Sequence, residues 1–503
     1  MRGKKTAINT VFSLMEEIVA VICGFILPRL ILTAFGSKYN GLTTSVSQFL
    51  TCAVLLRSGI GGATRAALYK PIAEENHDKI NSIVKATDIF MKKIGVTLAG
   101  LILLFATLYP FLVKNEFGWF FTFSLFLIIG ASTFAESFFG ITYLIVLQAD
   151  QKLWVSSLLK MICYVLNTAI GAVLILNGFS IHIVKLGGAI VYVAYPIILG
   201  LYVRKHYDIN SHVAPDNAAI SQRWDAFWQQ VAVFVMNNTD VIVLTIFTNM
   251  LEVSVYSVYN MVIHGLKRAV YALSSGLEAA FGNMIAKGEN RVLKENVGII
   301  ENLIYATSTI VYTCAALLIL SFVSIYTRKV TDVEYIRSAF AYIIIFSQFF
   351  NGVRIPYQLV VQAAGHYKQT KIGAIVEPII NISLSVFFVF KYGLVGVAVG
   401  TLAATIFRTL QYSMYMRKNI VIRNKLITIF RMMVSFVESG IIIVLVKLIK
   451  LDFPEGYSEW VLNAIIIGLI SLSIVTIGNT ICFKKDMIGA YKKLKNLGKK
   501  LRH

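Results

Sequence analysis

Charged side chains lie inside long apolar segments of this sequence, and their chemistry is that of anion binding. The segment Gly41 to Val84 carries Arg57 in its body and ends in a charged loop. A charged guanidinium facing lipid costs at least ~2.5–3.5 kcal/mol, so we expect Arg57 to face a cavity inside a helix bundle. A second segment, Val253 to Val297, carries Lys267 and Arg268 in the same way. Cavities lined by such cations suit an anionic ligand.

Arginine is well suited to phosphate, because its planar fork donates hydrogen bonds in pairs and stays charged at any working pH. The competing interpretation concerns residues near the ends of apolar segments. Arg29, Arg65 and Arg408 could extend their charged groups to the membrane surface instead. The candidate cations for binding an anionic group are Arg29, Arg57, Lys267, Arg268 and Arg354.

Acidic and amide side chains within apolar segments form a second set, suited to a cation. Glu377 and Asn381 are four residues apart, so they share one helix face. With Asp240 they offer oxygen ligands for Na⁺, and a carboxylate alone could carry a proton. Alternatively, Asp240 and Glu377 pair with intramembrane arginines and hold the helices together. Glu16 and Glu17 are polar cavity candidates, either as lining residues or as proton-coupling acids.

The elements that must position these residues are membrane-spanning helices. Hydrophobic residues make up 57% of the 503 residues, charged residues only 15%, and the mean hydropathy is +0.71. A helix crosses the hydrocarbon with ~20 apolar residues, which leaves room for about fourteen spans and no soluble domain. The predicted spans are 8–34, 42–69, 87–112, 119–147, 154–177, 182–203, 223–249, 253–286, 298–326, 335–362, 369–390, 393–416, 426–450 and 458–483.

The net charge of +21 follows from membrane topology rather than from nucleic-acid binding. Lysine and arginine concentrate in the even-numbered connections and in both tails, which predicts that the N- and C-termini are cytoplasmic. The five cysteines lie in apolar segments without metal-ligand spacing, so we expect neither a structural metal nor a cofactor.

An internal repeat relates spans 1–6 to spans 7–12. The matched positions are Leu32, Thr33 and Phe35 with Leu244, Thr245 and Phe247; Ala66 and Ala67 with Ala279 and Ala280; Tyr143, Gln148 and Asn167 with Tyr357, Gln362 and Asn381; Gly178 with Gly393; and Tyr202 with Tyr415. Because six is an even number, both copies begin on the same side of the membrane, so the repeats are parallel. We therefore predict an N-lobe at 1–203, a cytoplasmic linker at 204–222, a C-lobe at 223–416, and two further spans with a basic tail at 417–503.

Three stretches resemble the O-antigen and capsule flippases of the multidrug/oligosaccharidyl-lipid/polysaccharide exporter superfamily. They are FILPRLILTAFGSKYNGLTTSVSQFL at 25–50, GIGGATRAALYKPIAEENHDKINSIV at 59–84 and NNTDVIVLTIF at 237–247. One position departs from this pattern, since Arg57 stands where such flippases often have an acidic residue. LLRSGIGGATRAALYKP is also similar to the corresponding span of the murein-precursor flippase.

The resemblance implies a flippase that moves undecaprenyl-pyrophosphate-linked oligosaccharide to the outer leaflet of the bacterial cytoplasmic membrane by alternating access. It implies coupling to Na⁺ or H⁺, contact with membrane lipids, and a monomer. Glycosyltransferases and a polymerase of the same pathway are candidate protein partners. Nucleic acid is not expected as a partner.

Two other functions compete with this interpretation. A multidrug exporter of the same superfamily would favour an aromatic, acidic cavity, whereas the charges here are mostly basic. A membrane glycan polymerase or ligase would need catalytic groups in a sizeable outer loop, but the longest predicted outer connection has only about a dozen residues. The sequence also has no nucleophile elbow or Gly-rich nucleotide loop. We therefore expect a transporter rather than an enzyme.

Overall fold

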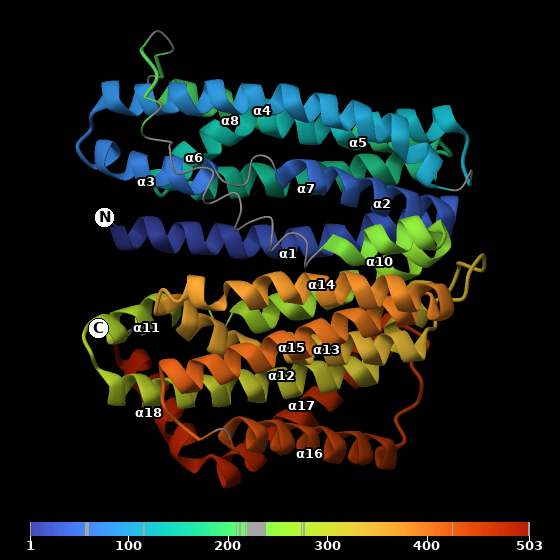
Figure 1. Ribbon diagram of the computed structural model, residues 1–503. Coiled ribbons are helices and arrows are strands. Elements are labelled where there is room, and N and C mark those ends of the chain that lie inside the picture. The colour runs from blue at the N-terminus through green and yellow to red at the C-terminus, as the bar shows by residue number, and fades with distance from the viewer. Residues whose placement is uncertain are drawn as a thin grey trace. The chain divides into compact units, whose positions relative to one another are not determined.

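The computed structural model describes residues 2–55, 60–113, 116–207, 209–210, 213–216, 218, 238–272, 274, 277–424 and 426–500. These residues form helices and no strands (Figure 1), which confirms the predicted all-α class. The chain divides into two compact units, Met1–Ser257 and Val258–His503.

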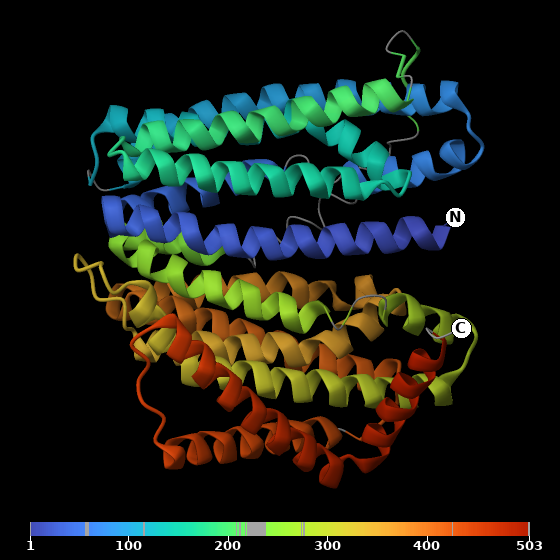
Figure 2. The same cartoon turned by 180° about the vertical axis from the view of Figure 1, so that it is seen from behind.

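The first unit is built mainly from long helices that pack side by side. In it α1 packs against α2 and α7, and α4 packs against α5; Figure 2 shows α7 and α8 lying next to each other. Its elements are α1 (Arg2–Phe35), α2 (Ser37–Val54), α3 (Ile60–Ala73), α4 (His77–Leu112), α5 (Trp119–Ala135), the π-helical turn η2 (Glu136–Gly140), α6 (Ile141–Ala149), α7 (Leu153–Leu176), α8 (Ile181–Tyr207) and a short helix, Asn238–Phe247.

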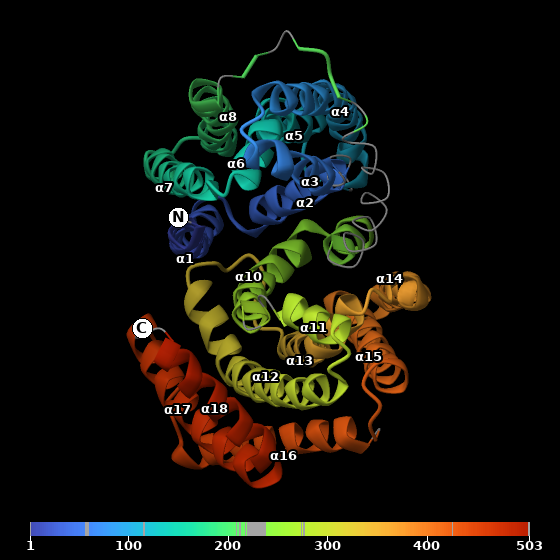
Figure 3. The same ribbon diagram turned by 90° about the vertical axis from the view of Figure 1, so that its left-hand side faces the viewer.

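The second unit has a central group of four helices, each of which packs against at least one other. In this group α15 packs against both α13 and α14, and α12 packs against α13. Figure 3 shows α16, α17 and α18 on the face of α12 opposite α13. The elements are α10 (Met250–Ala272), which begins in the first unit, α11 (Leu277–Ala286), α12 (Asn290–Tyr326), α13 (Ser338–Ala363), α14 (Tyr367–Tyr392), α15 (Leu394–Asn419), α16 (Leu426–Ile449), α17 (Tyr457–Cys482) and α18 (Lys484–Lys500).

Eleven helices in the described part of the chain are long and apolar enough to cross a membrane. They coincide with eleven of the fourteen predicted spans. The other three predicted spans are 42–69, which contains most of α2 and part of α3; 223–249, of which Asn238–Phe247 is described as a helix; and 253–286, which contains α10 and α11. The chain is therefore a multi-pass membrane protein, and its helix arrangement agrees with the predicted fourteen spans.

Most of the residues between the first two predicted spans, 8–34 and 42–69, are helical, because helix α2 begins at Ser37. Only Gly36 separates α1 from α2, and its φ of 86° provides the sharp change of direction that a residue with a side chain rarely adopts. Gly41 lies inside α2, where an added Cβ would come within 1.9 Å of the Met250 carbonyl oxygen. This glycine therefore permits close helix packing rather than a loop.

The predicted span 119–147 is one continuous membrane helix with a π-helical turn in its middle, at Glu136–Gly140. The turn brings Gly140 against Pro196 of α8, where an added Cβ would approach the proline Cβ to 2.6 Å. An extra residue in one turn shifts the helix face that follows it, so the turn sets which residues of α6 face α8.

A buried cluster of charges attaches α18 to the rest of the second unit. Glu301 of α12 is fully buried and contacts both Arg423 and Arg431. Arg431 of α16 also lies 2.5 Å from the carboxylate of Asp486 in α18 and donates to the Asn302 side chain at 2.9 Å. The predicted basic tail thus begins with helix α18, and Asp486 in the first turn of this helix pairs with Arg431.

We predict that Glu301→Gln destabilises the second unit, because it leaves Arg423 and Arg431 buried without their shared carboxylate. Loss of one partner from a buried ion pair costs ~3–5 kcal/mol, so the apparent melting temperature of the purified protein in detergent should fall by several degrees. Glu295→Gln is the matched control on α12, since that carboxylate is exposed and pairs only with Arg291 one turn away. Equal melting temperatures for the two variants would contradict the anchoring role.

Candidate functional site

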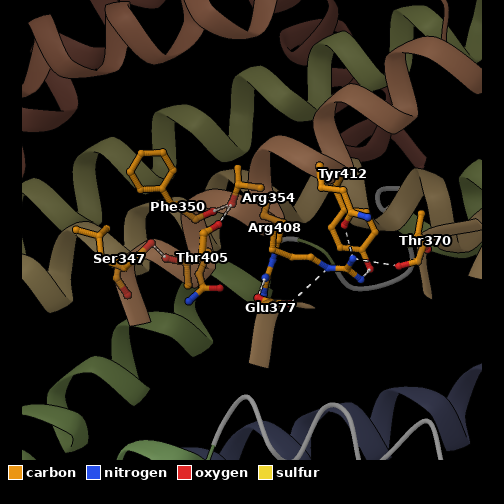
Figure 4. A network of polar contacts seen from close by, with 12 residues as sticks. Ser347, Phe350, Arg354, Thr370, Glu377, Thr405, Arg408 and Tyr412 are labelled. Carbon is orange, nitrogen blue, oxygen red and sulfur yellow. Dashed lines mark hydrogen bonds and ion pairs between the residues drawn. The ribbon is translucent and has the colours of Figure 1, made fainter. Parts of the chain in front are cut away.

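A buried network of charged residues connects three helices of the second unit (Figure 4). Arg354 of α13 donates to Glu377 of α14 at 2.6 Å. Arg408 of α15 approaches the other oxygen of the same carboxylate at 3.4 Å. The side chains of Arg354, Glu377 and Arg408 are 13%, 8% and 5% exposed, so this charge is removed from water almost completely.

Arg408 is held by neutral groups as well as by the carboxylate. Its guanidinium donates to the backbone carbonyl of Thr370 at 3.1 Å and to the hydroxyl of Tyr412 at 2.8 Å. The guanidinium carbon also lies 4.0 Å from the centre of the Tyr412 ring, in cation–π geometry. The interpretation of Arg408 as a residue reaching the membrane surface is therefore wrong, because its partners lie within the unit.

The network carries more positive than negative charge. Two guanidinium groups share the single carboxylate of Glu377, which leaves a formal excess of one positive charge. The Nε of Arg354 is buried and has no hydrogen-bond partner among the described residues. An excess of buried positive charge favours an anion nearby, and it opposes the binding of a free cation at Glu377.

Asn381 lies one turn beyond Glu377 on α14 and is also buried. Its side-chain oxygen accepts from Ser385 at 3.0 Å and from Thr401 of α15 at 3.4 Å. Gly400 allows this approach, since a Cβ there would come within 2.3 Å of the Ser385 hydroxyl. The amide thus joins α14 to α15 through neutral hydrogen bonds.

Two residues of the predicted ion-coupling set, Glu377 and Asn381, lie together in the second unit. Glu377 and Asn381 share a face of α14, as their spacing predicts, but Glu377 contacts two arginines. Asp240 belongs to the first unit, where it is buried and accepts a hydrogen bond from Tyr256 at 3.1 Å. The contacts of Glu377 are those of the alternative in which the acids pair with intramembrane arginines.

The remaining predicted residues have varied surroundings. Arg57 lies outside the described residues. Arg29 and Lys267 are half-buried, while Arg268 is exposed. Of the two polar cavity candidates, Glu16 lies 3.7 Å from the Lys160 ammonium, and Glu17 is exposed.

Sequence reasoning missed the residue pattern that makes the network. Arg408 was grouped with span-end residues because of its position along α15, yet it lies opposite the one acid in the middle of α14. The internal repeat offered a signal, because comparing the two copies shows which charged residues occur in one copy only. At an offset of 214 residues, Arg354, Glu377 and Arg408 correspond to Gly140, Cys163 and Ala194, so all three charges belong to one copy only.

Within the described residues, no group of three or more histidine, cysteine, aspartate or glutamate side chains is placed to hold a metal ion.

No model of a protein family matches the chain, and no curated protein matches it. Its fold is shared with solved membrane transporters. A lipid II flippase, MurJ, in an inward closed conformation superposes with a TM-score of 0.74 and 16% identity, over 95% of this chain and 100% of that one. An inward-facing multidrug resistance MATE family transporter of the MOP superfamily gives 0.60 and 14%, over 81% and 97%. A MOP superfamily transporter from Pyrococcus furiosus, described by the reverse polarity of its binding pocket, gives 0.53 and 12%, over 82% and 95%.

We predict that Glu377→Gln lowers the free energy of unfolding by ~3–5 kcal/mol, because both arginines lose their carboxylate. Adding Arg354→Gln to this variant should restore part of the loss, since one uncompensated guanidinium is removed. Thermal unfolding of the single and double variants in detergent measures both effects. Glu74→Gln serves as the control, because its pair with Lys70 is exposed at 3.8 Å. A double variant less stable than Glu377→Gln would show that Glu377 does not hold Arg354 in place.

Proposed function

We propose that this chain is a flippase that moves undecaprenyl-pyrophosphate-linked oligosaccharide, an O-antigen or capsule repeat unit, from the cytoplasmic to the outer leaflet. The observation that carries the proposal is the set of basic residues within the membrane-spanning part of the chain, in a fold shared with a lipid II flippase. A pyrophosphate cannot cross ~30 Å of hydrocarbon unless cations meet its charge.

One of the candidate cations for the pyrophosphate has an anionic partner in the structure. Arg354 is engaged by Glu377, so a phosphate would compete with a carboxylate there. Arg29, Arg57, Lys267 and Arg268 remain the proposed phosphate-binding residues. Alternating access is the proposed mechanism, in which two six-helix repeats rock against each other while the prenyl chain stays in lipid.

The proposed setting follows from the same reasoning. The protein acts as a monomer in the bacterial cytoplasmic membrane with both termini in the cytoplasm. Its partners are the lipid-linked oligosaccharide, membrane lipids, and glycosyltransferases and a polymerase of the same pathway.

Two alternative cargoes are favoured by specific observations. The similarity to MurJ favours a murein precursor. The similarity to a multidrug resistance transporter favours a drug, but the excess of positive charge around Glu377 disfavours the cationic drugs that an acidic cavity would bind.

A vesicle assay tests the proposal. An undecaprenyl-pyrophosphate-linked disaccharide is incorporated into both leaflets, and external periodate oxidises only the sugars of the outer leaflet. We expect oxidation to stop near half in protein-free vesicles and to approach completion with the protein. Arg268→Ala and Arg57→Ala should abolish this gain, because each removes a cation for the pyrophosphate, whereas Arg291→Ala, an exposed residue outside the proposed site, should not. Oxidation that stays near half with the unmodified protein would contradict a flippase for this lipid.

The proposed cation coupling predicts that flipping in the same vesicles depends on a Na⁺ or pH gradient. Glu377 is disfavoured as the coupling acid, because both of its oxygens contact arginines, and Asp240 is the other acid of the predicted set. Asp240→Asn should therefore remove the dependence on the gradient. Equal flipping rates with and without each gradient in the unmodified protein would contradict coupling.

A further inference from the structure

Two adjoining cavities open within the first unit. Their volumes are about 310 Å³ and 350 Å³. Both are lined by Leu27 of α1, Ser47 and Thr51 of α2, and Lys185 of α8. Small-molecule sites fall in the same range of volume and combine apolar walls with a few polar groups.

Lys185 is the one charged side chain on the walls of these cavities as described. It is half-buried on α8, one turn into the helix. Among the described residues it makes no hydrogen bond and no ion pair, and no acidic residue lines either cavity. A lysine ammonium needs water or an anion at such a site, because its charge is costly to desolvate.

Asn167 of α7 adds a second free donor to the wall of the larger cavity. Its amide makes no hydrogen bond within the described residues. The amide oxygen lies against Gly188 of α8, where an added Cβ would come within 2.3 Å of it. Gly188 therefore fixes the position of the amide next to the helix that carries Lys185.

In the second repeat, the asparagine equivalent to Asn167 is enclosed by hydrogen-bond partners. Asn167 corresponds to Asn381, whose oxygen is occupied by Ser385 and Thr401. The sixth span of each repeat also contains one basic residue other than histidine before its cytoplasmic end: Lys185 in the first and Arg408 in the second. Arg408 is neutralised by Glu377, and the position equivalent to Glu377 in the first repeat is a cysteine.

We infer that the paired cavities of the first unit form a binding subsite for an anionic group of a saccharide, with Lys185 as its charge partner. The ammonium attracts a carboxylate or a phosphate and repels cations, so the subsite is not one for Na⁺ or a cationic drug. Asn167 and the hydroxyl group of Thr44 can donate or accept hydrogen bonds with sugar hydroxyls. The hydroxyl groups of Ser47 and Thr51 donate to backbone carbonyls one turn earlier, so they can accept from a sugar. The inference rests on the proposed function and names the part of the cargo that this unit recognises.

Binding to the purified full chain in detergent tests the subsite. Isothermal titration with glucuronate, glucose and inorganic pyrophosphate compares an acidic sugar, a neutral sugar and a free phosphate anion. We expect glucuronate or pyrophosphate to bind, glucose to bind at least tenfold more weakly, and Lys185→Gln to weaken the anion by about tenfold or more. The stronger of the two anions identifies whether a sugar carboxylate or a phosphate is the natural group.

Matched variants separate a binding role from a structural one. Lys160→Gln changes another lysine of the same unit, but one that lies beside Glu16, and should leave anion binding unchanged. Lys185→Arg should retain part of the affinity, and Gly188→Ala should weaken binding by displacing Asn167 while keeping the charge. Anion binding by Lys185→Gln equal to that of the unmodified chain, or an affinity for glucose equal to that for the stronger of the two anions, overturns the inference.

The vesicle assay distinguishes this inference from the proposed function. If the unmodified chain flips the lipid and Lys185→Gln binds the anion as well as the unmodified chain does, the subsite is overturned and the flippase proposal is supported. Lysine-dependent anion binding in a chain that does not flip the lipid-linked disaccharide supports the subsite and overturns the flippase.

Discussion

The structure depends on one constraint: a charge within the membrane must meet an opposite charge, a polar partner or water. The two units satisfy this constraint in different ways. In the second unit Glu377 lies between Arg354 and Arg408, so the charges are satisfied by one another. In the first unit Lys185 lines a cavity with neutral polar walls. Buried pairs contribute little net stability but are costly to break, so the charges of the second unit hold α13, α14 and α15 together.

The two copies of the internal repeat differ in how their polar residues are surrounded. The two copies keep the asparagine of the fifth repeat span, Asn167 and Asn381, at equivalent positions. In the second copy the amide is enclosed by Ser385 and Thr401. In the first copy the corresponding amide lines an open cavity. The repeat therefore preserves the asparagine, while the surroundings of its amide differ between the two copies.

Much of this fold follows from the sequence, because apolar length and repeat offset are properties of the chain alone. The helices and the shared face of Glu377 and Asn381 were predictable from length and spacing. The helix start at Ser37 was not, because Gly41 resembles a loop residue until Met250 is seen beside it. The pairing of Arg408 with Glu377 was not predictable either, since the two residues are 31 positions apart and lie on different helices. Lys185 was missed although a lone lysine within the predicted span 182–203 was a usable signal.

The asymmetry between the copies bears on how a carrier of anionic cargo could avoid holding it too tightly. A cavity with many free arginines would bind a pyrophosphate strongly and release it slowly. Here the buried arginines of the second unit are offset by Glu377 and by the ring of Tyr412, which lowers the positive potential that they present. The charge on the walls of the two described cavities of the first unit is a single ammonium, a compact group without the paired donors of a guanidinium. A cargo with both an anionic head and polar sugars would then be recognised by several moderate contacts, each of which can be released as the helices around it move.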